Sequence, residues 1–285
     1  MVESLQEQLD RPSSQIITGI TTLVLLFVVM FVLEYLYFAS NSAAMRFHTL
    51  VGYTASPVDG PITIRQNSAV FLDADPIGLS VNERTGIEFS YSFYLRVLSS
   101  TFDGDAGMKH VFHKGYSMPW PLMGPGVFID GVTNKMRIFM NTYANPYTYL
   151  DVQNIPVGKW FHVVINSYRQ GLDVYVNGGL ANRMKFTNTL PYQNFSDIHI
   201  FQNVKMTLRG STVPAIKGDG GEETFTVNGV FSGSISNLAY ARYALSMGEI
   251  NRLMAQGPSS SVKASSMDTP PYMADDWWSN QTTAH

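Results

Sequence analysis

The stretch Gly158–Leu180, GKWFHVVINSYRQGLDVYVNGGL, decides the fold. Residues Trp160–Ser167 alternate between two faces that are both largely apolar near the start, which is typical of a central β-strand. Arg169–Gly171 predicts a short turn, and Leu172–Val176 predicts a strand that runs back along the first. Asn177-Gly178 then supplies the strongest short signal for a further hairpin turn.

Similar signals recur through most of the chain. Short runs rich in Val, Ile, Phe and Tyr alternate with Gly, Asn, Asp and Pro, which indicates an all-β sandwich or barrel. In one of these runs, Phe89, Tyr91, Phe93 and Leu95 share an apolar face at period two. The runs are Gly86–Val97, Lys109–Gly115, Gly126–Gly131, Lys135–Tyr143, Asp197–Gln202 and Val230–Ala241.

A short helix is predicted after the last strand. Ser246 and Glu249 form an S-x-x-E capping box, in which each side chain satisfies a free amide at the helix start. An apolar stripe follows, and Gly257-Pro258 ends the helix. We expect this helix to lie against the sandwich as a lid on one edge.

The opening hairpin resembles the central hairpin of the concanavalin A-like, laminin-G-like family. There a Trp and a His enter one strand, and the next strand ends in Tyr-x-Asn-Gly. The matching residues are Trp160, His162, Tyr175, Asn177 and Gly178, and we expect Trp160 to be a core anchor. Three further blocks, FSYSFYLRV, HVFHKG and VFSGSISNLAYARYALSMGEINRLM, resemble the family's other segments in the same order. The resemblance covers about residues 58–257 and implies an all-β, two-sheet antiparallel sandwich (jelly roll) with a short C-terminal helix.

One N-terminal segment predicts a transmembrane helix. Ile16–Phe38 is apolar except for Glu34, and as a helix it spans about 35 Å, against about 30 Å for a hydrocarbon core. The alternatives are a cleaved signal peptide, which the acidic leader Met1–Arg11 disfavours, and a buried core helix. The predicted membrane-anchor residues are Ile16, Ile20, Leu23, Leu26, Phe27, Met30, Phe31, Leu33, Tyr35 and Tyr37.

These elements predict a linear layout. A short polar N-terminus (residues 1–15) precedes the transmembrane helix (16–38), a linker (39–57), the sandwich (58–257) and an extended C-terminal arm (258–285). The orientation of the helix in the membrane stays open, because each flank carries one basic residue, Arg11 before it and Arg46 after it. The absence of Cys favours the cytosolic side for the folded part.

Composition excludes several classes of protein. The net charge of −3 argues against nucleic acid as a partner, since polyanion binders carry a basic face. With no Cys, disulfides and thiolate metal sites are excluded. Glycoside hydrolases on such folds need two facing carboxylates. The acids expected on strands are isolated from one another, so we expect no enzymatic activity and no catalytic residues; they are Glu88, Asp130, Asp151, Asp173 and Asp197.

Calcium is the one cofactor that the residues suggest. Asp103 and Asp105 flank a glycine, and calcium needs several oxygens that converge from loops. The alternative is a solvated turn, where Asp and Gly are common. We expect His113, His162 and His199 to be packed or hydrogen-bonded sheet residues, because no metal-binding histidine pair is present.

Two segments are candidates for binding. Trp120, in the Pro-rich loop Tyr116–Gly126, could form an aromatic platform for a glycan, although a packed loop or a protein contact is equally compatible. The arm Pro258–His285 begins Ser-rich and ends on aromatic residues of the kind that anchor protein interfaces. Its partner-docking candidates are Tyr272, Trp277 and Trp278, and docking in cis or in trans stays open.

The overall layout resembles membrane-anchored laminin-G-like virion proteins of large eukaryotic DNA viruses. The resemblance implies a non-enzymatic structural protein, a minor capsid component that links an inner membrane to the capsid shell. Its partners would be the lipid bilayer and capsid proteins, and its location the interface between virion membrane and capsid. The alternative is a membrane-anchored carbohydrate-binding or adhesion module, because fold alone does not fix function.

Overall fold

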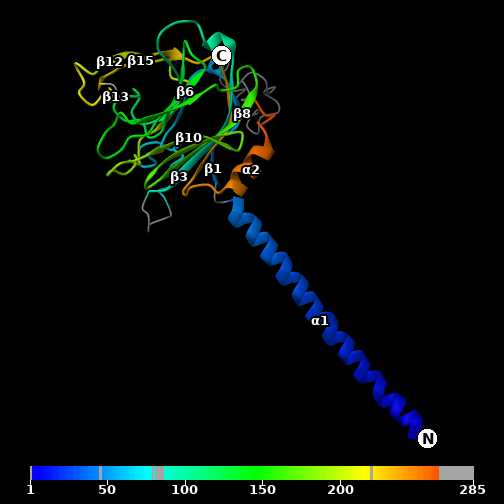
Figure 1. The fold of residues 1–285 in the computed structure, drawn as a ribbon. Coiled ribbons are helices and arrows are strands. Elements are labelled where there is room, and N and C mark those ends of the chain that lie inside the picture. Colours follow the sequence, from blue (N-terminus) through cyan, green and yellow to red (C-terminus); the bar gives the residue numbers. More distant parts are fainter. Residues whose placement is uncertain (1, 45–46, 79, 81–86, 219–220, 263–285) are drawn as a thin grey trace, which may run out of the picture. The chain divides into compact units, whose positions relative to one another are not determined.

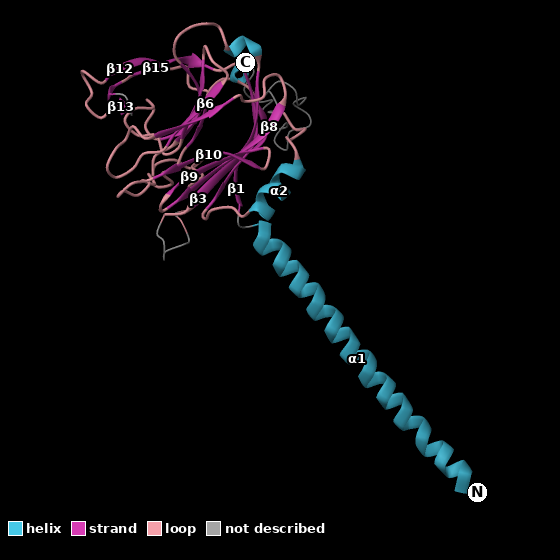
Figure 2. Ribbon diagram, viewed as in Figure 1, coloured by secondary structure: helices cyan, strands magenta, loops and turns pink. Residues whose placement is uncertain are grey.

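The computed structural model describes residues 2–44, 47–78, 80, 87–218 and 221–262. The chain divides into two units, Met1–Phe47 and His48–His285, and each is described by itself. The first unit is the helix α1 (Val2–Ala44). The second is built from strands joined by loops, with one short α-helix (Figures 1 and 2).

Helix α1 contains a stretch that is long and apolar enough to cross a membrane, Gln15–Leu36, and a signal sequence would have the same properties. The side chains of this stretch are all exposed within the unit. Its hydroxyls bond inside the helix, since Thr21 and Thr22 each donate to the carbonyl four residues earlier at 2.8 Å. The helix is longer than predicted and includes most of the polar N-terminus and the start of the expected linker.

One sheet of the sandwich has six strands. Its centre is β3 (Phe89–Val97), which pairs antiparallel with β8 (Trp160–Tyr168) on one side and with β16 (Gly233–Ala241) on the other. The full order is β1-β16-β3-β8-β9-β10. The remaining strands are β1 (Phe47–Ala55), β9 (Gly171–Val176) and β10 (Gly179–Lys185).

The second sheet has eight strands. Its main path is β12-β15-β4-β5-β6-β7, and β11 joins β4 to β2. The strands are β2 (Ile62–Ile64), β4 (Met108–Lys114), β5 (Gly126–Asp130), β6 (Lys135–Phe139), β7 (Tyr149–Gln153), β11 (Ile198–Ile200), β12 (Lys205–Arg209) and β15 (Thr224–Val230). Three short elements and a two-strand hairpin complete the fold: η1 (Pro57–Asp59), η2 (Ser99–Thr101), α2 (Met247–Gln256), β13 (Lys217–Gly218) and β14 (Gly221–Glu222).

The two-sheet sandwich with one short C-terminal helix is confirmed. One strand pair departs from the predicted antiparallel pattern, because β15 runs parallel to β4. The direction of β15 is set by its neighbours in the chain: it pairs antiparallel with β12 and continues after two residues into β16 of the other sheet.

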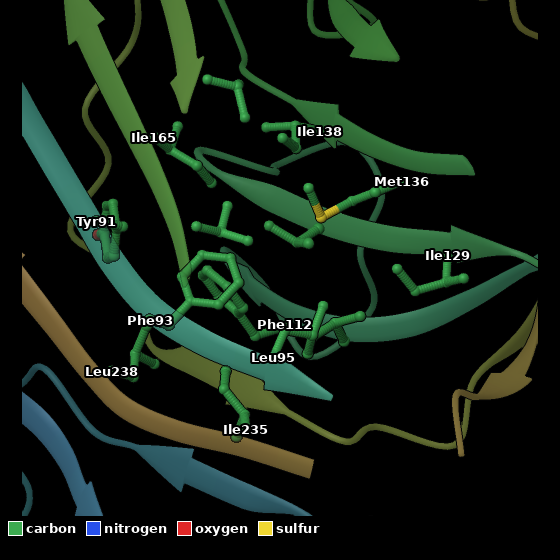
Figure 3. Close-up of a cluster of buried hydrophobic side chains, with 14 of the residues drawn as sticks. Tyr91, Phe93, Leu95, Phe112, Ile129, Met136, Ile138, Ile165, Ile235 and Leu238 are labelled. Atoms are coloured by element: carbon green, nitrogen blue, oxygen red, sulfur yellow. The ribbon is translucent and has the colours of Figure 1, made fainter. Parts of the chain in front are cut away.

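The main core lies between the two sheets. Phe93 of β3 meets Phe112 of β4 edge to face, with ring centroids 5.2 Å apart, and both side chains are fully buried. Figure 3 shows side chains of both sheets converging in this layer, among them Ile165 of β8 and Ile138 of β6. The period-two prediction for β3 is confirmed, because all four of its predicted apolar residues belong to this core.

Helix α2 covers the outer face of the six-stranded sheet. The Tyr94 hydroxyl lies 2.9 Å and 2.6 Å from the carbonyls of Leu253 and Met254, at the end of the helix. The Asn166 amide donates to the Leu245 carbonyl at 2.9 Å, just before the helix starts. The predicted capping box of α2 is present. The helix therefore seals the polar side of β3 and β8 rather than an edge, and that side is buried as well.

The opening hairpin follows its turn chemistry. Asn177 and Gly178 have φ of 49° and 77°, as the predicted turn requires. The turn between β8 and β9 contains two residues rather than three. Trp160 is only partly buried, so its assignment as a core anchor was wrong. Strand alternation places the next residue, Phe161, in the core instead.

The expected linker contains a strand, so the sandwich starts before Val58. Strand β1 belongs to the six-stranded sheet, and its Val51 and Ala55 are buried in the main core. The end of the described chain is attached to the same strand, since the Thr54 amide donates to the Ser261 carbonyl at 2.7 Å. Residues 258–262 of the expected arm thus lie on the sandwich. Tyr272, Trp277 and Trp278 lie outside the described residues.

Candidate functional site

An open groove of about 340 Å³ lies beside the turn between β8 and β9. Arg169, Gln170 and Asn188 present exposed polar groups here, whereas Phe186 is buried. The Phe186 amide donates to the Gln170 carbonyl at 2.9 Å, which fixes the segment after β10 to this turn. The described lining consists of Arg169, Gln170, Phe186, Asn188, Thr189 and Leu190.

Two tyrosines adjoin the groove. The Tyr143 amide donates to the Leu190 carbonyl at 3.0 Å, so the loop after β6 lies against the groove wall. The rings of Tyr143 and Tyr192 meet edge to face, with centroids 5.1 Å apart. Tyr143 is 68% exposed, which leaves an aromatic surface free for contact beside the polar groups of the groove. We call Tyr143, Tyr192 and the six lining residues the tyrosine groove.

Trp120, the predicted glycan platform, is partly buried and belongs to a second apolar cluster on the eight-stranded sheet. Its ring lies 6.2 Å from that of Tyr147, edge to face. The Asn141 side chain donates to the Pro121 carbonyl at 3.0 Å and accepts from the Met123 amide, which fixes the loop. This geometry favours the packed-loop alternative.

The predicted calcium loop is already occupied by protein groups. Lys109 donates to the Asp103 carboxylate at 2.7 Å, and this hydrogen bond lowers the pKa of Asp103. The Asp105 carboxylate accepts from the Asn228 side chain. Across the part of the chain that the structure describes, no group of three or more His, Asp or Glu could hold a metal ion. Asp103 and Asp105 are therefore both engaged with protein groups.

The other strand carboxylates are likewise engaged. Asp151 receives two hydrogen bonds from Arg137, at 2.7 and 2.8 Å, and Asp173 receives two from Arg183, both at 2.6 Å. Such bidentate pairs fix both partners. Asp130 lies 3.1 Å from Lys135. The same Lys135 ammonium also lies 3.7 Å from Asp151, so each of these three acids is paired with a cation on the sheets.

Three histidines, two on β4 and one on β11, form a buried cluster. His110 and His113 are an odd number of residues apart, yet their rings bond at 2.7 Å, because a β-bulge lies between His110 and Phe112. The ring of His199 stacks on that of His113 with centroids 5.1 Å apart. The packed role expected for His113, His162 and His199 is confirmed. The cluster of His110, His113 and His199 was not predicted, because the spacing of these residues in the sequence does not place them together.

The hydrogen bonds of this cluster fix its protonation. His110 Nδ1 accepts from the Gln202 amide at 3.1 Å, so a neutral His110 carries its proton on Nε2 and donates to His113 Nδ1. His113 must then donate from Nε2 to the Tyr116 carbonyl, at 2.7 Å. Burial lowers the pKa of His113 to about 4 and that of His162 to about 4. A further proton on His110 or His113 would convert the Nδ1 that accepts a hydrogen bond into a second donor.

Comparison with known proteins leaves the family open. No protein-family model and no curated protein matches the chain. Among solved structures, the chain is similar to a botulinum neurotoxin type C structure, with 18% identity over 72% of this chain and 42% of that one, at a TM-score of 0.44. The receptor-binding domain of botulinum neurotoxin D gives 12% identity, coverage of 74% and 47%, and a TM-score of 0.46.

A third similar structure is the binding domain of botulinum neurotoxin DC in complex with rat synaptotagmin II. It is 17% identical over 74% of this chain and 46% of that one, with a TM-score of 0.43. The chain thus spans less than half the length of these structures. Likeness at this level carries no argument about the ligands of this chain.

The buried histidines predict an acid-sensitive fold. Their folded-state pKa values lie below the value of about 6.5 for an unfolded chain, so the unfolded state binds more protons between about pH 6.5 and pH 4. The contribution of these histidines to the unfolding free energy should be constant above about pH 6.5 and fall as the pH approaches 4, by on the order of 3 kcal/mol each for His113 and His162. Urea unfolding of the detergent-solubilised chain, followed by tryptophan fluorescence, measures it.

The matched variant is H162Q, which removes one titrating ring and should show a smaller loss over the same pH range. Imidazole nitrogen NMR gives an independent check of the fixed tautomers. An unfolding free energy that is equal at pH 7 and pH 4.5, or a proton on Nδ1 of His110 at pH 7, would contradict the interpretation.

Proposed function

We propose that this chain is a single-pass membrane protein whose β-sandwich is a non-enzymatic binding domain for a saccharide. The observation that carries the proposal is the tyrosine groove. Its volume of about 340 Å³ falls within the range of about 300–1,000 Å³ that is usual for small-molecule sites.

The chemistry of the groove matches that of a sugar. Sugar rings present C–H surfaces that pack on aromatic faces, and Tyr143 supplies an exposed ring. Their hydroxyl groups need donors and acceptors at the ring edge. Arg169 supplies donors, and Gln170 and Asn188 each supply both kinds of group.

The non-enzymatic part of the proposal rests on the lack of acidic groups in the described lining of the groove. The described residues that line the groove include no carboxylate. Hydrolysis of a glycosidic bond uses two carboxyl groups, about 5–9.5 Å apart, on either side of the scissile bond. The groove can therefore hold a saccharide, but it lacks the acid and the nucleophile or base that cleavage requires.

The saccharide proposal predicts which substitutions weaken binding. A glycan array probed with the full chain in nanodiscs should give hits, and isothermal titration should then give the affinity for the best hit. Y143A and R169A should each weaken binding by about tenfold, which is ~1.4 kcal/mol. The matched control is Y116A, since Tyr116 is also exposed but lies outside the groove. A silent array, or equal affinities for Y143A and Y116A, would contradict the proposal.

A second candidate function is structural, as a link between an inner virion membrane and its capsid. It is favoured by the attachment of residues 259–262 to β1, where Thr54 and Val262 form a parallel bridge. The residues that follow, with Tyr272, Trp277 and Trp278, would therefore start from a fixed point on the sandwich. The resemblance of the sequence to membrane-anchored laminin-G-like virion proteins supplies the rest of this proposal.

The lipid bilayer is the proposed partner of α1. Its central side chains are apolar and largely exposed, from 48% at Val29 to 70% at Phe31. An exposed apolar run of this length is unfavourable in water and is typical of a membrane or interface contact. We assign the predicted anchor residues, Ile16 through Tyr35, to this contact. The side chain of Tyr37 lies outside the described ones.

One experiment tests the anchor and the arm together. The full chain and a chain ending at Val262 should both stay in carbonate-washed membranes with the N-terminal helix intact by mass spectrometry. The full chain should form crosslinks to a partner protein, and the shortened chain, which lacks Tyr272, Trp277 and Trp278, should form far fewer. Removal of the helix by cleavage contradicts the anchor, and equal crosslinking of both chains contradicts the structural role.

A further inference from the structure

Lys114, the last residue of β4, has an almost completely buried ammonium group. Its side chain is 1% exposed, and Nζ donates to the Ser196 carbonyl at 2.5 Å. Within the described residues, no carboxylate oxygen lies within 4.0 Å of Nζ, whereas the buried Lys109 has such a partner in Asp103. A buried ammonium without a paired anion is unfavourable. Lys114 therefore has donors to spare for an anionic partner.

Lys114 is one of the residues that line a cavity of about 80 Å³. About 10–15 Å³ is enough for one water, so this space can hold a small ion of several atoms. It is too small for a sugar ring. It is lined by different residues from those of the tyrosine groove. Two of them, Pro76 and Phe195, are exposed, which gives the cavity access from solvent.

The amide side chains of the cavity wall are already engaged with the protein. Gln66 donates to the Asp75 carbonyl at 2.8 Å and accepts from the Ile77 amide at 2.9 Å. Asn194 donates to the Lys114 carbonyl and accepts from the Ser196 amide, both at 3.0 Å. The Gln193 side chain donates to the Tyr240 hydroxyl at 2.5 Å and accepts from the Ser80 amide at 3.3 Å. These side chains hold the wall in place, and Lys114 is left as the group that can bind a ligand.

We propose that this cavity is a binding site for a small oxyanion, a carboxylate or a phosphate, held by the ammonium group of Lys114. The anion accepts the free N–H groups of Lys114 and neutralises a charge that the fold has buried. The exposed ring of Phe195 lies at the mouth of the site, so a carboxylate with a short apolar substituent fits as well as a free ion.

The charge state of Lys114 gives the site a pH dependence. Burial lowers the pKa of Lys114 to about 8, and the nearby Asp197 carboxylate acts in the opposite direction. The Asp197 carboxylate accepts a hydrogen bond from the backbone amide of Gln66 at 2.8 Å. The rings of His113 and His199 are buried, and their lowered pKa values leave both neutral at pH 7. Because only the ammonium form attracts an anion, affinity should be highest below about pH 8 and fall above it. The bound anion should in turn raise the pKa of Lys114.

The test is a lysine ammonium NMR titration of the full chain in detergent micelles. Sodium acetate and sodium phosphate are added in separate arms, each against sodium chloride at equal ionic strength. We expect a saturable shift of the Lys114 signal and a rise of its pKa by about one unit, which corresponds to a tenfold preference of the anion for the protonated form. The exposed Lys185 is the internal control. A response to acetate but not to phosphate would identify a carboxylate site, and the converse a phosphate site.

The matched variant is K114M, in which the anion should no longer raise the melting temperature relative to chloride. Should K114M fail to fold, the wild-type titration still decides. Equal shifts of Lys114 and Lys185, or a Lys114 signal that responds to chloride as it does to both oxyanions, would overturn the proposal. Y143A should leave the anion response unchanged, so failure of the saccharide proposal and failure of this one are distinguishable.

Discussion

Burial of both faces of the central strands β3 and β8 is the constraint on which the rest of the sandwich depends. The inner face packs through aromatic rings such as Phe93 on Phe112. The outer face carries polar groups, and these are buried only because α2 and its flanking residues supply partners for Tyr94 and Asn166. A buried polar group without such a partner would cost about 1–3 kcal/mol. The helix is therefore part of the core structure and not an appendage.

This arrangement leaves the sheet centres closed, and both proposed binding sites lie at the rims. The tyrosine groove forms where the β8–β9 turn, the segment after β10 and the loop after β6 meet, and backbone hydrogen bonds hold all three together. The Lys114 cavity forms at the end of β4, where the sheet gives way to loops. Both proposed sites include loop residues held by the sandwich, and binding residues are often found on loops positioned by a rigid scaffold.

Local signals in the sequence predicted the parts of the fold that local physics determines. The alternation in β3, the turn at Asn177-Gly178 and the capping box at Ser246 all depend on residues close in the chain. Strand β1 was missed because it follows a small and polar stretch and Thr and Gly separate its apolar residues, and its burial depends on pairing with a strand almost 200 residues away.

The sites depended on long-range geometry, and the sequence predicted little of them. The tyrosine groove joins Tyr143, Arg169 and Asn188, which lie on three separate segments. The histidine cluster depends on a β-bulge in β4 that the residues of this strand do not predict. Trp120 was singled out for its chemistry, but the fold uses much of its ring for packing. An unpaired buried lysine is likewise visible only once its neighbours are known.

Amide hydrogen exchange of the full chain tests the two-sided burial of the central strands most directly. If the account is right, the paired amides of β3 and β8 exchange slowest of all, at the rate set by global unfolding, because neither face opens without the loss of a whole layer. The amides of the exposed edge strand β10 that pair with β9 should exchange faster. Exchange of β3 and β8 at the same rate as β10 would contradict the account.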